Sequence, residues 1–93
     1  MSKKRTRMEV MHDILGVVKN KNGKIKPTHI LYKSNLSHQM MDQYIRELTE
    51  KYFLIEQKLK RGRTYWITPK GSQFLEKYEI IDEFTSSFGL KYN

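Results

Sequence analysis

The residues with the clearest chemical character in this sequence are basic, and they are concentrated in three segments. The chain has 93 residues, and 18 lysines and arginines against 10 acidic residues give a formal net charge of +8 at pH 7. Segregated positive charge is typical of a protein that binds a polyanion such as nucleic acid. The alternative is a set of solvated charges that only keep a small protein soluble. Three stretches without any acid hold most of the basic residues: Lys3, Lys4, Arg5 and Arg7; Lys19, Lys21, Lys24 and Lys26; Lys58, Lys60, Arg61 and Arg63.

Residues suited to catalysis or metal binding are few, and they do not combine into a site. His12, His29 and His38 share no metal-ligand spacing, and the chain contains no cysteine. We expect no dyad between His12 and Asp13, because adjacent residues project to different parts of a helix surface. The sequence also lacks a phosphate-binding glycine loop and a nucleophile elbow. We therefore expect a protein that is not an enzyme and uses no metal, cofactor or small-molecule ligand.

The length and composition of the chain predict one small folded domain. Its 93 residues suffice for one modest core, and 38% of them are hydrophobic. No apolar run approaches the roughly twenty residues of a membrane span, and polar residues interrupt any signal-peptide pattern. The absence of cysteine fits an intracellular protein. We expect a cytoplasmic protein with no membrane partner.

Local signals predict where the elements that carry the basic segments begin and end. Thr6 and Glu9 form a capping-box pattern, and Ser37 suits a helix cap after a tight turn at Asn35. Thr68 is a further cap, followed by proline in the first helical turn. Together with apolar spacing, these signals predict helices over residues 6–19, 28–34 and 38–51, a short strand over 24–26, a hairpin over 53–67 and a last helix from 69.

This order of elements is that of a winged helix-turn-helix. We expect an α+β fold, mainly α, with a two- to three-stranded antiparallel wing sheet and a C-terminal helix. Of Tyr65 and Trp66, one is expected in the core, although both could stack on single-stranded bases. Close packing against a neighbour would explain Gly16 inside the first helix. The apolar stripes also predict a core position for Tyr32 and for the methionines Met8, Met11, Met40 and Met41.

The stretch from Pro27 to Ser37 resembles the helix-turn-helix segment of small archaeal winged-helix proteins. That group comprises predicted transcriptional regulators and a chromatin-associated dimer with a long C-terminal coiled coil. The resemblance implies that the third helix and the wing bind double-stranded DNA. This sequence ends at Asn93 soon after Gly89, so we expect no long coiled coil of that kind. The resemblance covers about residues 5–88 and includes the segments 44–48, 67–71 and 74–78.

In a helix-turn-helix, the N-terminal residues of the second helix meet base edges in the major groove. We expect His38, Gln39 and Gln43 to make base or water-mediated contacts, and Arg46 to reach a phosphate or a base. Ser37 is a cap and a candidate phosphate donor. The alternative is a solvated polar helix face. Asp42 disfavours phosphate unless it accepts from a cytosine amine or pairs with Arg46, which argues against a purely non-specific binder.

The wing over residues 58–64 is expected to contact the DNA backbone or the minor groove. Its candidate residues are Lys58, Lys60, Arg61 and Arg63. The alternative is a charged turn that protects a sheet edge from aggregation. A flexible N-terminal arm over residues 1–7 is expected to follow the backbone through Lys3, Lys4 and Arg5, unless it is only a solvated end.

The C-terminal helix carries more apolar surface than one small domain needs. We expect a homodimer interface through Phe74, Ile81, Phe84 and Phe88, and the alternative is that these residues fold back on their own core. Residues 8–79 would then form the winged helix-turn-helix domain, and residues 80–93 a C-terminal extension. Three functions remain open: a transcriptional regulator, a general nucleoid-associated or chromatin binder, and a protein-interaction module.

Overall fold

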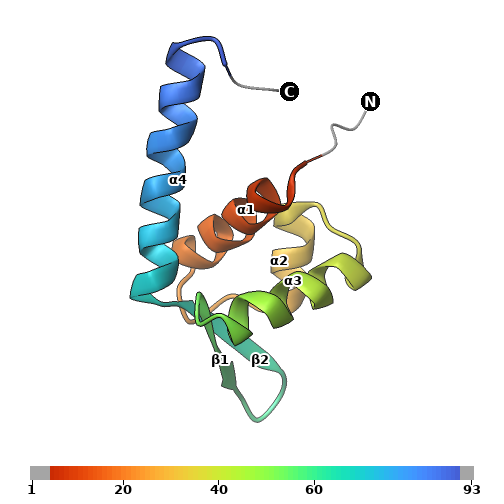
Figure 1. Ribbon diagram of the computed structural model, residues 1–93. Coiled ribbons are helices and arrows are strands. Elements are labelled where there is room, and N and C mark those ends of the chain that lie inside the picture. Colours follow the sequence, from red (N-terminus) through yellow and green to blue (C-terminus); the bar gives the residue numbers. More distant parts are fainter. Residues whose placement is uncertain (1–4, 91–93) are drawn as a thin grey trace.

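The computed structural model describes residues 5–90, which form four helices and a two-stranded antiparallel sheet (Figure 1). This architecture confirms the predicted fold class, a winged helix-turn-helix with a C-terminal helix. The elements in chain order are α1 (Arg7–Asn20), α2 (Pro27–Ser34), α3 (His38–Glu50), β1 (Leu54–Lys58), β2 (Arg63–Ile67) and α4 (Pro69–Ser87).

Three of the four helices begin at the caps that the sequence predicted. Thr6 and Glu9 form a complete capping box at α1, which satisfies two backbone amides that lack a partner within the helix. Ser37 Oγ accepts a hydrogen bond from the Met40 amide at 3.2 Å, and Thr68 Oγ1 accepts from the Gly71 amide at 3.0 Å. α2 begins at Pro27, one residue before its predicted start, and has no side-chain cap.

The core is built around α1, whose apolar stripe is buried against α2, α4 and β2. Ile14, Leu15 and Val18 are fully buried, as expected for a helix with neighbours on several sides. Met11 and Met41 lie in the core, whereas Met8, Met40 and Tyr32 are exposed, so the prediction was wrong for these three. The other elements contribute Ile30 and Leu31, Ile45 and Leu48, Leu54, Tyr65 and Leu75.

The sheet is a hairpin with an additional backbone bridge. Leu54 pairs with Ile67 and Lys58 with Arg63, and Ile25 forms an isolated bridge to Tyr65 on the other side of β2. The turn closes through the Leu59 amide and the Gly62 carbonyl, and glycine suits this turn because its φ is +83°. Tyr65 is buried and Trp66 is exposed, so one of the two aromatic residues belongs to the core, as predicted. The hairpin projects away from the helices (Figure 1).

α4 packs on α1 near its start and then extends beyond the rest of the domain (Figure 1). The ring of Phe74 meets the ring of Phe53 edge to face, with centroids 5.5 Å apart. The helix continues without interruption past residue 80, where the predicted C-terminal helix extension begins. None of the helices within residues 5–90 is long and apolar enough to cross a membrane.

Two glycines in helices provide a test of the packing. A Cβ at Gly71 would overlap the Phe53 carbonyl oxygen and lie 2.7 Å from Ile67 Cγ1, whereas a Cβ at Gly16 would meet nothing within 4 Å. Close packing therefore does not explain Gly16. We expect Gly71→Ala to lower the free energy of unfolding by about 2 kcal/mol through overpacking, and Gly16→Ala to raise it by about 0.5–1 kcal/mol through helix propensity.

Urea unfolding followed by circular dichroism measures both changes. A Gly71→Ala protein as stable as the parent would show that α4 does not pack on the sheet at this distance.

Candidate nucleic-acid interface

The outer face of α3 carries the polar side chains that the sequence predicted for base contacts. Met41, Ile45 and Leu48 are buried on the opposite face of the helix. Since one side of α3 lies in the core and the other in solvent, the polar side chains of the outer face stay hydrated and need no partner within the protein. The residues exposed on the outer face are His38, Gln39, Asp42, Gln43 and Arg46.

The turn between α2 and α3 sets the direction of α3. Asn35 adopts the left-handed conformation, with φ 54° and ψ 56°, which asparagine tolerates better than most residues. The buried Leu36 donates its amide to the Leu31 carbonyl at 3.0 Å. Ser37 caps α3, and its exposed position at a helix N-terminus also suits an anion.

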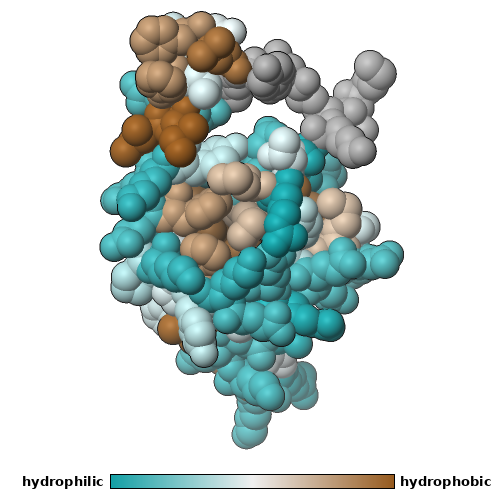
Figure 2. Space-filling model, in the orientation of Figure 1, coloured by the Kyte–Doolittle hydropathy of each residue, from teal (hydrophilic) through white to brown (hydrophobic). Residues whose placement is uncertain are grey.

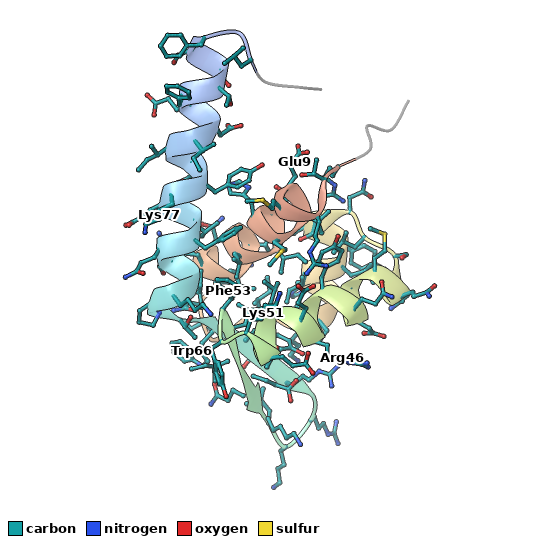
Figure 3. The ribbon with its side chains drawn as sticks, viewed as in Figure 1. Glu9, Arg46, Lys51, Phe53, Trp66 and Lys77 are labelled. Carbon is teal, nitrogen blue, oxygen red and sulfur yellow. The ribbon has the colours of Figure 1, made fainter. Side chains whose placement is uncertain are left out.

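The wing presents its four basic side chains to solvent, as expected from sequence: Lys58, Lys60, Arg61 and Arg63. Lys58 lies directly opposite Arg63 in the antiparallel register. Like charges in facing positions disfavour the sheet by itself, and a bound polyanion would relieve this repulsion. Figure 3 shows long side chains ending in nitrogen that extend from the tip of the hairpin.

A groove between α3 and the sheet contains charges of both signs. Arg46 extends outward from α3 on this side (Figure 3). On the sheet side of the groove, the Arg63 Nε atom of β2 lies 3.8 Å from Glu56 Oε1 of β1. Among residues 5–90, Asp42 forms no ion pair with Arg46, so the pairing considered from sequence is not made. The lining consists of Met41, Asp42, Ile45, Arg46, Thr49 and Glu50 from α3, and Glu56, Arg63 and Tyr65 from the sheet.

Tyr65 occupies the floor of this groove. Its hydroxyl donates a hydrogen bond to Glu56 Oε1 at 3.2 Å. Burial raises the pKa of Tyr65 to about 12, the Arg63 charge opposes this shift, and Glu56 adds to it. The hydroxyl therefore stays protonated at neutral pH and remains a donor to the carboxylate.

A second groove brings the start of α2 beside the wing. Lys26, Pro27 and Thr28 line one side of it, and the other side consists of Lys58, Leu59, Arg61, Gly62 and Arg63. Lys26 was not among the predicted site residues, although it belongs to the second basic segment. That segment was the available sequence signal. The bridge between Ile25 and Tyr65, together with the hydrogen bond from the Gly23 amide to the Tyr65 carbonyl, brings it to the wing.

Of the basic residues expected in the N-terminal arm, the structure describes Arg5 and Arg7, and both contact other parts of the domain. Lys3 and Lys4 lie outside the described residues. Arg5 is half-buried and donates to Asp13 Oδ2 at 2.7 Å and to the Asn35 carbonyl at 3.0 Å. Arg7 opens α1 and forms an ion pair with Glu47 of α3. Both described arginines of this segment are thus engaged within the domain.

The apolar residues expected at a dimer interface separate into two groups. Phe74 packs against the core of its own domain, as the alternative interpretation required. Ile81, Phe84 and Phe88 are 59%, 56% and 67% exposed, and the rings of Phe84 and Phe88 lie with centroids 4.9 Å apart. Figure 2 shows hydrophobic residues gathered on the far end of α4, while hydrophilic residues cover the wing.

The His12 side chain makes more contacts than the sequence suggested. Its Nδ1 atom lies 3.2 Å from Asp13 Oδ1, so the two side chains meet although adjacent helix positions were expected to project apart. Its ring also stacks on Tyr78 of α4, with centroids 4.5 Å apart. Within residues 5–90 there is no group of three or more histidine, aspartate or glutamate residues that could hold a metal ion.

A turn between two helices, followed by a two-stranded wing, is the arrangement of the winged-helix class of proteins, and here α4 follows the wing. A family model described as "Winged helix-turn-helix" matches residues 4–86, which is most of the chain. The chain belongs to this winged helix-turn-helix family, as its resemblance to archaeal winged-helix proteins implied.

Similar proteins come from archaea and bacteria. The uncharacterized protein MJ0290 of Methanocaldococcus jannaschii is 37% identical over 80 residues, and the match covers 86% of this chain but 35% of that protein. Sso10a-2, a DNA-binding protein from Sulfolobus solfataricus, superposes with a TM-score of 0.76 at 23% identity, over 96% of this chain and 100% of that one. MepR, a transcription regulator of a Staphylococcus aureus efflux pump, has a TM-score of 0.71 at 16% identity, over 90% and 64% of the two chains.

The raised pKa of Tyr65 predicts a pH dependence of stability. The folded protein holds the Tyr65 proton to about pH 12, whereas an unfolded tyrosine loses it near pH 10. The stabilising contribution of protonated Tyr65 to the free energy of unfolding is therefore complete below pH 10. It is lost as the pH rises toward 12. We expect the urea midpoint of the parent to fall more steeply between pH 9.5 and 11.5 than that of Tyr65→Phe. Equal slopes for the two proteins would contradict the assignment.

Proposed function

We propose that this protein binds double-stranded DNA and acts as a transcriptional regulator. α3 enters the major groove, and the wing lies on the phosphate backbone or in the minor groove. The observation that carries the proposal is the juxtaposition of the exposed polar face of α3 with the exposed basic wing across one groove. We expect a binding function without catalysis, exercised on the nucleoid in the cytoplasm.

The charges of α3 suit base contacts better than phosphate contacts, which other elements would make. The helix contains Asp42, Glu47 and Glu50 but only one basic residue, Arg46. A helix of this charge gains little from phosphates. Affinity would therefore come from the wing, from Lys26 and from Lys3 and Lys4, while His38, Gln39 and Gln43 meet base edges and Ser37 supplies a cap and a phosphate contact.

The acidic residues of α3 favour a sequence-preferring regulator over a general chromatin binder. Glu47 is paired with Arg7 and Lys51, whereas Asp42 is exposed and has no ion pair among residues 5–90. An exposed carboxylate in the major groove repels phosphate at every site, and only bases with an exocyclic amine at the groove edge, cytosine above all, offer it a donor. The DNA-binding protein Sso10a-2 and the transcription regulator MepR share the fold, which is consistent with this proposal.

We also propose that two copies associate through the far end of α4. Exposed apolar surface of this kind marks an interaction site, and this end of the helix extends past the domain that would have to cover it (Figure 1). An adjoining groove between α1 and α4 is mostly apolar and includes Met8, Tyr78, Ile81 and Leu90. A two-fold pair would present two α3 helices to half-sites about 34 Å apart, or a multiple of that distance.

Salt dependence tests the DNA proposal. We expect Arg61→Ala with Arg63→Ala to weaken duplex binding at all sequences and to reduce the slope of log affinity against log salt by up to about 1.8, because two phosphate contacts are lost. Gln43→Ala should leave the slope unchanged and alter the sequences that are selected from random DNA. Fluorescence anisotropy at several salt concentrations measures the first effect.

Lys77→Ala is the matched control, since it removes one charge from an exposed position on α4 (Figure 3). Absence of binding by the parent at low salt would reject DNA binding and leave the protein-interaction module. Selection of no preferred site by the parent would favour the general chromatin binder over the regulator.

Sedimentation equilibrium tests the association through α4. We expect a dimer for the parent and a monomer for Phe84→Asp with Phe88→Asp, because two carboxylates would be buried without partners at the interface. Leu59→Asp, which places a charge on the exposed wing turn, should remain dimeric. A parent that is monomeric at high concentration would refute the interface.

A further inference from the structure

Arg5 bridges two parts of the domain that are distant in sequence. One guanidinium nitrogen donates to Asp13 Oδ2 on α1 at 2.7 Å, and the other donates to the backbone carbonyl of Asn35 at 3.0 Å. The Arg5 side chain is 25% exposed. A planar fork that meets two acceptors at once holds them at a fixed separation, which a flexible ammonium does not.

The Asn35 carbonyl, which Arg5 contacts, lies in the turn that joins α2 to α3. Asn35 ends α2 in the left-handed conformation, and a helix C-terminus carries unpaired carbonyls and partial negative charge that a cation stabilises. α3 begins at His38, three residues further along. A displacement of this carbonyl would therefore move His38 and Gln39, which stand at the start of the proposed recognition helix.

Neighbouring contacts stabilise the same region, in which the start of α1 meets α3. Arg7 pairs with Glu47 of α3, and Thr6 caps α1. Asp13 is in turn held by His12 Nδ1 at 3.2 Å. Both terminal nitrogens of Arg5 are thus committed to a packed part of the protein.

We propose that Arg5 is a positioning residue, which fixes the turn before α3 by joining it to Asp13, and not a phosphate contact of the basic arm. This inference rests on the proposed DNA binding, because it names a residue that aligns the recognition helix. Arg5 would thus act within the domain, whereas the wing arginines are proposed to contact phosphates, although all of them carry the same charge.

Substitution of Arg5 separates positioning from phosphate contact. Arg5→Lys keeps the charge and lacks the fork, so positioning predicts that it binds duplex DNA about tenfold more weakly than the parent, as Arg5→Ala does. The salt slope should be unchanged in both variants. A phosphate contact predicts that Arg5→Lys retains affinity and that Arg5→Ala lowers the slope by about 0.9, and this result would overturn the proposal.

The partner of Arg5 provides an independent arm of the experiment. Asp13→Asn removes a negative charge, which by electrostatics alone should strengthen DNA binding. Positioning predicts weaker binding instead, with Arg5→Ala plus Asp13→Asn no weaker than Arg5→Ala, since both changes break one interaction. Tighter binding by Asp13→Asn would contradict the proposal.

A measurement without DNA distinguishes failure of this inference from failure of the proposed function. The Leu36 amide is hydrogen-bonded to Leu31, so its hydrogen exchange reports on the turn. We expect faster exchange at Leu36 in Arg5→Lys and no change in Lys77→Ala. Unchanged exchange at Leu36 would refute the positioning role, whether or not the parent binds DNA.

Discussion

Tyr65, the largest of the fully buried side chains, joins the wing to the helices through the core and the backbone. Its backbone bridges to Ile25, and its carbonyl accepts from the Gly23 amide at 2.9 Å, so the segment before α2 is held to β2. Its hydroxyl reaches Glu56 on β1. Together with the hydrogen bond from the Ile67 amide to Asn22 Oδ1, these contacts of Tyr65 place Lys26 and Arg63 on one surface, and burial of the aromatic ring stabilises the arrangement.

The charge of the molecule is organised by elements and not spread over the surface. α3 is more acidic than basic, while the wing and the start of α2 are basic. In the proposed DNA complex this arrangement would place phosphate contacts at the periphery and base contacts on the helix, and only the base contacts carry sequence information. The facing pair of Lys58 and Arg63 disfavours the sheet by like-charge repulsion.

α4 combines two roles in one uninterrupted helix. Its first turns belong to the domain core through Phe74 and Leu75, and its last turns expose Phe84 and Phe88 to solvent. Apolar spacing predicted both groups as one surface, because a helical stripe does not reveal where the neighbouring element stops. The same limit explains why Met8 and Tyr32 were predicted to be core residues although they are exposed.

The sequence by itself determined the order of the elements and the points at which they begin. Caps such as Thr6, Ser37 and Thr68 act on amides within three residues of themselves, so their effect is local and readable. Only the tertiary structure decided which of several similar residues act together. Arg5 and Arg61 carry the same charge, yet one is fastened to Asp13 and Asn35 and the other is exposed. Contacts between segments that are distant along the chain depend on packing, which no local pattern encodes.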